Sequence, residues 1–156
     1  PAEPMSRALE ELRQRIESEE SVIVHVRRGD LVTNRSAQAF HGLLPVSYYE
    51  DALHVLLERM PTAHTYLFTD DPQWCSTALG HLPALTIVDS SRFPGPSAHH
   101  LHTMTAGKAF VLANSSFSWW AAWLSQAPPE KVIAPSCWFA GSPHLTGPAL
   151  DEWIRV

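Results

Sequence analysis

The sequence has no run of about 18 consecutive apolar residues, the length that a membrane-spanning helix needs, and no signal-peptide pattern. We therefore expect no part of it to span a membrane. Cysteine is also scarce. Cys75 and Cys137 lie far apart and form no CxxC pair, so the sequence predicts neither a disulfide framework nor a zinc ribbon, but two buried free thiols.

Basic residues are fewer than acidic ones. The 11 Lys and Arg residues stand against 16 Asp and Glu residues, which gives a formal net charge of −5. Proteins that bind nucleic acid in general, or a membrane surface, present a broad basic patch. The composition therefore argues against both classes, and any positive charge that serves a ligand must be local.

Glycine-rich phosphate loops are missing as well. No GxGxxG follows a predicted strand, and the chain contains no P-loop. If a nucleotide binds, side chains and helix N-termini must hold its phosphates. A zinc site at His99, His100 and His102 is disfavoured against a solvated helix, because no cysteine or acidic residue is spaced with these histidines.

Segments of strand and helix alternate along the 156 residues. This order predicts one α/β domain over 1–156, a Rossmann-like three-layer fold with a parallel sheet of about five strands. A leading amphipathic helix falls within 1–20, a polar loop follows at 31–44, and 140–156 forms an irregular tail. The strands are expected at 22–26, 65–69, 85–88, 109–113 and 131–134, and the later helices at 45–59, 72–80, 99–106 and 117–124.

Two local signals refine this prediction. Asp71 followed by Pro72 is typical of an N-cap and a first helical position, and Gly80 fits the end of that helix. The helix that contains Trp119, Trp120 and Trp123 is apolar on every side, which favours packing of these rings in the core.

The first strand stops abruptly at Arg27 and Arg28. Ligands of open α/β sheets bind at the carboxyl ends of the strands, and guanidinium groups match the oxygens of a phosphate or diphosphate. The pair therefore indicates an anionic ligand. The alternative is that both arginines form surface ion pairs, as exposed arginines commonly do.

A second anion site is predicted at 114–116 (NSS), where the fourth strand gives way to a helix. Backbone N–H groups and hydroxyls at the positive end of that helix would face Arg27 and Arg28 across the carboxyl edge of the sheet. The alternative is a plain N-cap.

Five motifs together give the chain a resemblance to a known family. From about residue 22 to 153 it resembles the carboxyl-terminal half of the α-1,2-fucosyltransferases of glycosyltransferase family 11. The motifs are, in order, 25–30 (HVRRGD), 41–45 (HGLLP) with 48–49 (YY), 69–72 (TDDP) with 74–75 (WC), 113–120 (ANSSFSWW), and 132–135 (VIAP) with 138–139 (WF).

The resemblance implies a GT-B arrangement of two Rossmann-like domains, in which this half holds GDP-fucose. The family's amino-terminal Gly-Gly-Leu-Gly-Asn-Gln stretch is missing, so we expect the chain to be part of a longer protein that includes the acceptor domain. Bacterial members work in the cytoplasm, and the same is expected here, with any membrane association made through regions outside this sequence.

The same resemblance assigns roles to residues. Arg27 and Arg28 would neutralise the diphosphate and stabilise the departing GDP, His25 would frame the nucleotide pocket, and Asp30 is the only acid in the central motif. His100 stands where the family tends to carry an acid that reads guanine, and a neutral imidazole cannot accept both guanine N–H donors. The further substrate-binding candidates are Asp70, Asn114, Ser115, Ser116 and Ser118.

The implied reaction is inverting transfer of L-fucose from GDP-fucose to the 2-hydroxyl of a galactose-terminated glycan. No metal, no cofactor and no nucleic-acid partner are expected. Two alternatives stay open: a non-catalytic module that binds a sugar nucleotide, and an interaction domain in which Arg27 and Arg28 serve ion pairs.

Overall fold

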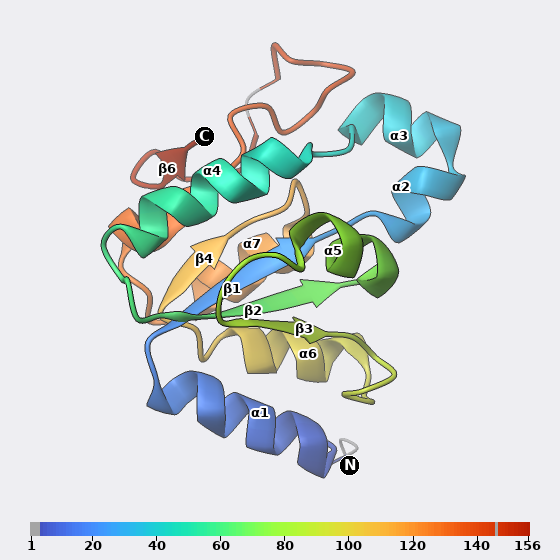
Figure 1. The fold of residues 1–156 in the computed structure, drawn as a ribbon. Helices are drawn as coiled ribbons and strands as arrows, with labels where there is room; N and C mark the ends of the chain where they lie inside the picture. The colour runs from blue at the N-terminus through green and yellow to red at the C-terminus, as the bar shows by residue number, and fades with distance from the viewer. Residues whose placement is uncertain (1–3, 146) are drawn as a thin grey trace.

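Six parallel strands form one sheet in the order β3-β2-β1-β4-β5-β6 (Figure 1). The computed structural model describes residues 4–145 and 147–156, and of Asp30 it describes the backbone alone. The strands are β1 (Ser21–Val26), β2 (His64–Thr69), β3 (Leu85–Val88), β4 (Ala109–Val111), β5 (Val132–Ala134) and β6 (Ile154–Arg155). The predicted α/β class and parallel sheet are confirmed.

Helices cover both faces of this sheet and give the molecule three layers (Figure 1). One face carries α1 (Arg7–Ser18), α6 (Ser97–Met104) and α7 (Ser116–Leu124), and the other carries α4 (Val46–Leu57) and α5 (Pro72–Leu79). Two short helices, α2 (Gly29–Thr33) and α3 (Arg35–His41), connect β1 to α4, and a 3-10 turn, η1 (Pro129–Lys131), precedes β5.

Each face of the sheet has its own hydrophobic core. Ile23 of β1 packs with Leu9 and Leu12 of α1 in the first core. Val24 of β1 packs with Leu53 of α4 in the second. Side chains of a strand alternate between its two faces, so the apolar run of β1 supplies both cores and is buried throughout.

The predicted start of α5 is confirmed in detail. Asp71 is its N-cap, and Oδ1 of Asp71 accepts a hydrogen bond from the backbone N–H of Trp74 at 3.1 Å. Pro72 takes the first helical position, where its missing N–H costs nothing, and Gly80 follows the last residue.

The loop predicted at 31–44 is wrong, because this stretch contains the end of α2 and all of α3. Asn34 begins α3: its side-chain oxygen accepts hydrogen bonds from the N–H groups of Ser36 and Ala37, both at 3.1 Å. The irregular tail predicted at 140–156 also needs correction, since β6 adds a sixth strand by pairing Ile154 with Ile133. The sequence did not predict β6 because a strand of two residues is too short to show an alternating hydrophobic pattern.

The prediction that all three tryptophans of α7 pack in the core is wrong. Trp120 and Trp123 are 49% and 52% exposed. The small residues Ser118, Ala121 and Ala122 of α7 face the core. The rings of Trp120 and Trp123 therefore lie on the outer side of the helix.

The two cysteines are free, as predicted, but only Cys75 is buried, whereas Cys137 is exposed. Across the described ranges 4–145 and 147–156, no helix has both the length and the apolar character that crossing a bilayer requires.

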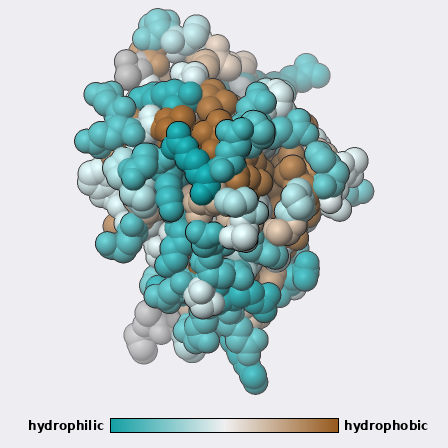
Figure 2. Space-filling view, turned by 60° about the vertical axis from the view of Figure 1, so that its left-hand side comes forward, coloured by the Kyte–Doolittle hydropathy of each residue, from teal (hydrophilic) through white to brown (hydrophobic). Residues whose placement is uncertain are grey.

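One edge of the sheet has an apolar surface. Figure 2 shows hydrophobic side chains gathered between hydrophilic ones on the side of the molecule where β6 and the carboxyl end of α4 lie in Figure 1. Leu57 of α4, Ile154 of β6 and the terminal Val156 are partly buried against the second core.

Candidate functional site

The predicted anion-binding stretches meet at the point where the strand order reverses. The chain runs outward from β1 through β2 to β3, then returns to place β4 on the other side of β1. In doubly wound sheets, ligands bind in the crevice at this switch point, outside the carboxyl ends of the strands. Arg27 and Arg28 follow β1, and 114–116 follows its direct neighbour β4, so the structure brings both stretches to this crevice.

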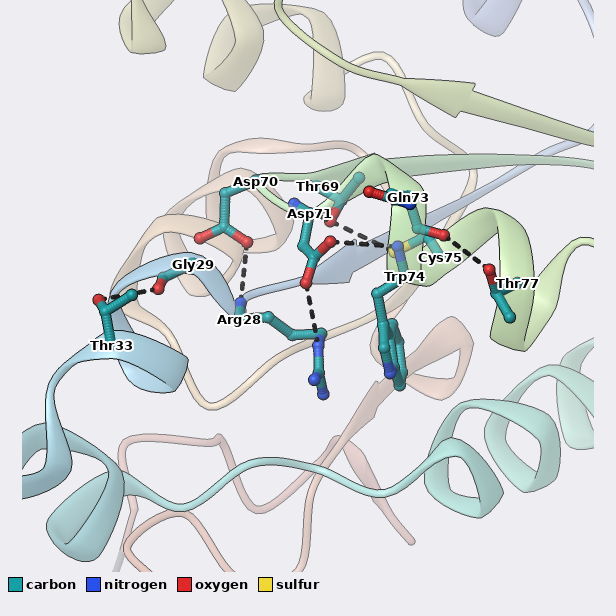
Figure 3. Close-up of polar contacts among 10 residues, drawn as sticks. All are labelled: Arg28, Gly29, Thr33, Thr69, Asp70, Asp71, Gln73, Trp74, Cys75 and Thr77. Atoms are coloured by element: carbon teal, nitrogen blue, oxygen red, sulfur yellow. Dashed lines mark hydrogen bonds and ion pairs between the residues drawn. The ribbon is translucent and has the colours of Figure 1, made fainter.

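Arg28 points toward α5. Its Nε lies 3.4 Å from Oδ2 of Asp71, and its guanidinium carbon lies 4.0 Å from the centroid of the Trp74 ring (Figure 3). The backbone N–H of Arg28 donates to Oδ1 of Asp70 at 2.8 Å. The guanidinium therefore does not face the start of α7 as predicted, and the ion-pair alternative describes Arg28 in part.

Arg27 lies near His25. The positive charge of Arg27 helps to lower the pKa of His25, and the ring of His25 lies against Phe117 of α7, with the ring centroids 5.5 Å apart. Arg28 therefore contacts α5, whereas the charge of Arg27 acts on His25 at the end of β1.

The serines after β4 differ in what they offer a ligand. Ser115 is the N-cap of α7, and its hydroxyl oxygen accepts from the N–H of Phe117 at 3.3 Å. Ser118 is fully buried, and its hydroxyl donates to the carbonyls of Ala113 and Ser115. Ser116, the first residue of α7, is exposed. Of these three hydroxyls, that of Ser116 is the one placed to meet a ligand.

Asn114 has a structural task that the sequence did not reveal. Its buried amide nitrogen donates to the carbonyls of His41 at 2.7 Å, Gly42 at 3.4 Å and Trp138 at 3.3 Å. These bonds join the end of α3 and the segment after β5 to the switch point. No local pattern predicts them, because the nearest partner is 24 residues away in the chain.

A cavity of about 290 Å³ opens at the carboxyl ends of β1, β2 and β3, beside the starts of α6 and α7. Three predicted substrate-binding residues, His25, Asp70 and His100, line it. Sequence reasoning missed the aromatic walls, Phe68 and Phe117, although each directly precedes or lies within a motif already singled out.

The two imidazoles of this cavity are neutral at physiological pH. Burial lowers the pKa of His25 to about 4, and burial also lowers the pKa of His100. Nδ1 of His25 and Nε2 of His100 are buried without a hydrogen-bond partner in the described part of the chain. Burying such atoms without a partner costs stability.

The other candidates are placed as follows. Asp30 lies in the first turn of α2, and its side chain falls outside what the structure describes. Within residues 4–145 and 147–156, no group of three or more His, Cys, Asp or Glu side chains is arranged to hold a metal ion.

Comparison with known proteins gives consistent matches. The sequence model of Glycosyl transferase family 11 matches residues 3–154. The chain is 34% identical over 140 residues to the O-antigen biosynthesis glycosyltransferase WbnK of Escherichia coli. The aligned region covers 90% of this chain and 46% of WbnK. It is also 34% identical over 149 residues to an alpha-1,2-colitosyltransferase of Escherichia coli. That alignment covers 94% of this chain and 51% of the colitosyltransferase.

The chain spans about half the length of the curated relatives it matches. No solved structure matches it significantly. The family match extends over nearly the whole sequence and confirms the resemblance carried by the five motifs. The chain belongs to glycosyltransferase family 11.

Proposed function

We propose that this chain is the donor-binding half of a glycosyltransferase that transfers L-fucose from GDP-fucose to the 2-hydroxyl of a galactoside. The observation that carries the proposal is the switch point between β1 and β4. There Arg27 and Arg28 follow β1 and the positive end of α7 follows β4, beside a cavity that Phe117 of α7 lines. A nucleoside diphosphate has the matching parts, a flat base and a dianionic phosphate pair.

In the proposed reaction the acceptor 2-hydroxyl attacks the anomeric carbon of the β-linked donor from the opposite face. A bond forms between this oxygen and the carbon, the bond from the carbon to the phosphate oxygen breaks, and the hydroxyl proton passes to a general base. Charge develops on the leaving GDP, and fixed positive groups lower the barrier by stabilising it.

Different residues have different roles in the proposed reaction. Arg27, the exposed hydroxyl of Ser116 and the N-terminus of α7 contact the diphosphate. Arg28, whose guanidinium Asp71 and Trp74 hold in place, supplies a second positive charge at the end of β1. Asp70 holds the Arg28 backbone and lines the cavity. Asp30, the acid of the central motif, is the proposed catalytic carboxylate.

The relative named alpha-1,2-colitosyltransferase supports the α-1,2 linkage and also suggests a second donor sugar, colitose. Both donors are tested in one assay. The longest natural polypeptide that contains this chain is incubated with lactose and either GDP-fucose or a colitosyl donor. Transfer of fucose to the galactose 2-hydroxyl supports the proposal. Transfer of colitose without transfer of fucose would identify the colitosyl compound as the donor in place of GDP-fucose. Nucleotide binding without any sugar transfer would favour a non-catalytic module.

Calorimetry with GDP tests the binding site directly. We expect Arg27→Ala to weaken GDP binding by roughly 10- to 100-fold, the loss typical of a hydrogen bond to a charged group. The melting temperature should stay close to that of the wild type. Arg59→Ala, which removes an exposed arginine far from the cavity, is the matched control. Equal GDP affinity in Arg27→Ala and the wild type would overturn the diphosphate assignment.

A further inference from the structure

The outer side of α7 carries large apolar side chains that the proposed reaction does not use. Trp120, Trp123 and Leu124 are each about half exposed. By the size typical of such side chains, the three together present roughly 300 Å² of apolar surface to solvent. A contiguous apolar patch of this extent on a monomer is often a binding site.

The indole rings of α7 form one fixed assembly. The ring of Trp119 lies parallel to that of Trp123, with centroids 5.3 Å apart and planes at 10°, and it meets Trp120 edge to face. Nε1 of Trp119 donates to the carbonyl of Pro148 at 2.8 Å, and its ring contacts that of the buried Trp153. Trp119 therefore anchors the assembly. Because it covers one face of Trp123, the exposed area of Trp123 lies on the other face and the edges of that ring.

This assembly continues from the proposed diphosphate site. Residues three and four apart in a helix lie on the same side, so Ser116, Trp120 and Trp123 follow one another along the outer side of α7. Ser116 is exposed at the switch point, and the helix rises about 10 Å from there to Trp123. An acceptor glycan whose reacting sugar lies near Ser116 therefore has an aromatic surface beside its next sugars.

The size and chemistry of the patch fit a sugar better than a protein. A stable protein interface takes about 800 Å² from each partner, well above the roughly 300 Å² available here. One face of a pyranose ring presents C–H groups that stack on an indole, and its hydroxyls need polar partners at the rim. The exposed Asp151 and Glu152, which precede Trp153 in the chain, place carboxylates near the assembly. A glycan acceptor is also the partner that membership of a glycosyltransferase family implies.

We propose that the rings of Trp120 and Trp123 form a second carbohydrate site, which stacks against sugars of the acceptor glycan beyond the one that reacts. Its role as an acceptor subsite rests on the proposed transfer to a galactoside, and it specifies which part of a long acceptor this chain holds. The site contributes to the binding of an oligosaccharide. It does not contribute to the binding of a single galactose, which is too short to reach Trp123 from the switch point.

Acceptor kinetics of the longest natural polypeptide that contains this chain test the proposal. Methyl β-galactoside offers only the reacting sugar, whereas lacto-N-neotetraose offers a terminal β-galactose followed by further sugars. We expect Trp123→Ala to raise KM for the tetrasaccharide by roughly 3- to 10-fold, the loss of one aromatic contact, and to leave KM for methyl β-galactoside and both kcat values unchanged. Trp123→Phe, which keeps an aromatic face, should recover most of this loss. An equal effect of Trp123→Ala on both acceptors, or no effect on either, would overturn the proposal.

Leu124→Ala is the matched control on the same helix. Leu124 is as exposed as Trp123 but has no ring, so KM for the tetrasaccharide should stay within about twofold of the wild-type value. A protein surface covering the patch would lose contacts with either side chain. Sedimentation of the wild type and both variants measures this. Self-association that both substitutions abolish, with an unchanged KM for the tetrasaccharide, would make the patch an interface between copies and overturn the carbohydrate site.

A binding experiment separates this proposal from the proposed function. Saturation-transfer NMR on the same polypeptide, without a donor, detects contact between aromatic protons and the C–H groups of lacto-N-neotetraose. Signals from sugars beyond the terminal galactose that Trp123→Ala reduces support the site even where no sugar is transferred, and then the proposed function alone fails. Transfer of fucose to methyl β-galactoside, with equal signals in the wild type and Trp123→Ala, overturns the site and leaves the proposed function standing.

Discussion

The guanidinium of Arg28 lies over the indole ring of Trp74, with its carbon 4.0 Å from the ring centroid (Figure 3). Oδ2 of Asp71 contacts Nε of the same guanidinium. A cation over an aromatic face gains about 0.5 to 2 kcal/mol, depending on how far it is desolvated. The indole and the carboxylate together fix the plane of Arg28, although the long side chain has many rotamers.

Replacing Trp74 should therefore loosen Arg28 without removing it. We expect Trp74→Leu to weaken GDP binding by roughly 3- to 10-fold, the equivalent of a cation–π contact, and Trp74→Phe to restore most of the loss. Calorimetry measures both, and denaturation in urea checks that the variants fold. An unchanged GDP affinity in Trp74→Leu would show that the indole does not position Arg28 for the ligand.

Asp71 combines two contacts whose contributions can be separated. Oδ1 caps α5, and Oδ2 contacts Arg28. We expect Asp71→Ala to lower the unfolding free energy by about 1 to 2 kcal/mol, mainly through loss of the cap. Asp71→Asn keeps a capping oxygen and loses only a partly exposed ion pair, which is worth under about 1 kcal/mol. Urea denaturation compares the two variants, and equal losses would mean that the cap contributes little.

The parts of the fold that sequence predicts are those with local causes. Asp71 and Pro72 mark the start of α5 because both the cap and the first turn involve neighbouring residues. The central strand β1 was predictable because its apolar run is buried on both faces. The meeting of the motifs after β1 and β4 follows from the parallel order of the strands.

The parts that sequence did not predict depend on distant partners. The direction of Arg28 is decided by Trp74 and Asp71, which arrive from another strand–helix unit. The exposure of Trp123 follows from which side of an evenly apolar helix meets the sheet, and hydropathy alone does not choose that side. Within the site, the resemblance predicted His25, Asp70 and His100 of the cavity, whereas its aromatic walls and the task of Asn114 were not predicted.

The stability of the fold should be sensitive to a negative charge introduced at Asn114 without a change of side-chain size. Its amide donates to three carbonyl oxygens, and the side chain is 3% exposed. Asn114→Ala removes the hydrogen bonds to these carbonyls and should cost about 1 to 3 kcal/mol of unfolding free energy. Asn114→Asp should cost more, since a buried carboxylate would face three carbonyl oxygens. Asn34→Asp is the matched control, because aspartate caps α3 as well as asparagine does. Equal stability of Asn114→Asp and Asn34→Asp would contradict the bridging role.

The two thiols should react at very different rates. Burial raises the pKa of Cys75 to about 11, whereas Cys137 is exposed. Since the thiolate is the reactive form, a thiol reagent at about pH 8 should label one site in the folded protein and the second only in denaturant. Cys137→Ser should abolish the fast reaction, and Cys75→Ser should leave it unchanged. A fast reaction in Cys137→Ser would mean that the second core opens readily around Cys75.

Stability should fall in mild acid because of His25. Burial lowers the pKa of this imidazole from 6.5 to about 4 in the folded chain. Below pH 6.5 the unfolded chain binds a proton at this position that the folded chain does not bind until the pH is near 4. The unfolding free energy therefore decreases as the pH falls through this window, by about 3 kcal/mol in total.

His25→Gln removes the titrating group and should flatten that part of the pH profile. Unfolding in urea at several pH values between 4 and 7 measures the difference between the variant and the wild type. His54→Gln, at an exposed position of α4, is the control and should keep the wild-type slope. In the proposed complex GDP occupies the cavity that His25 lines, so saturating GDP should preserve the acid dependence in the wild type while raising its stability at every pH. A His25→Gln profile as steep as that of the wild type would show that other groups cause the loss in acid.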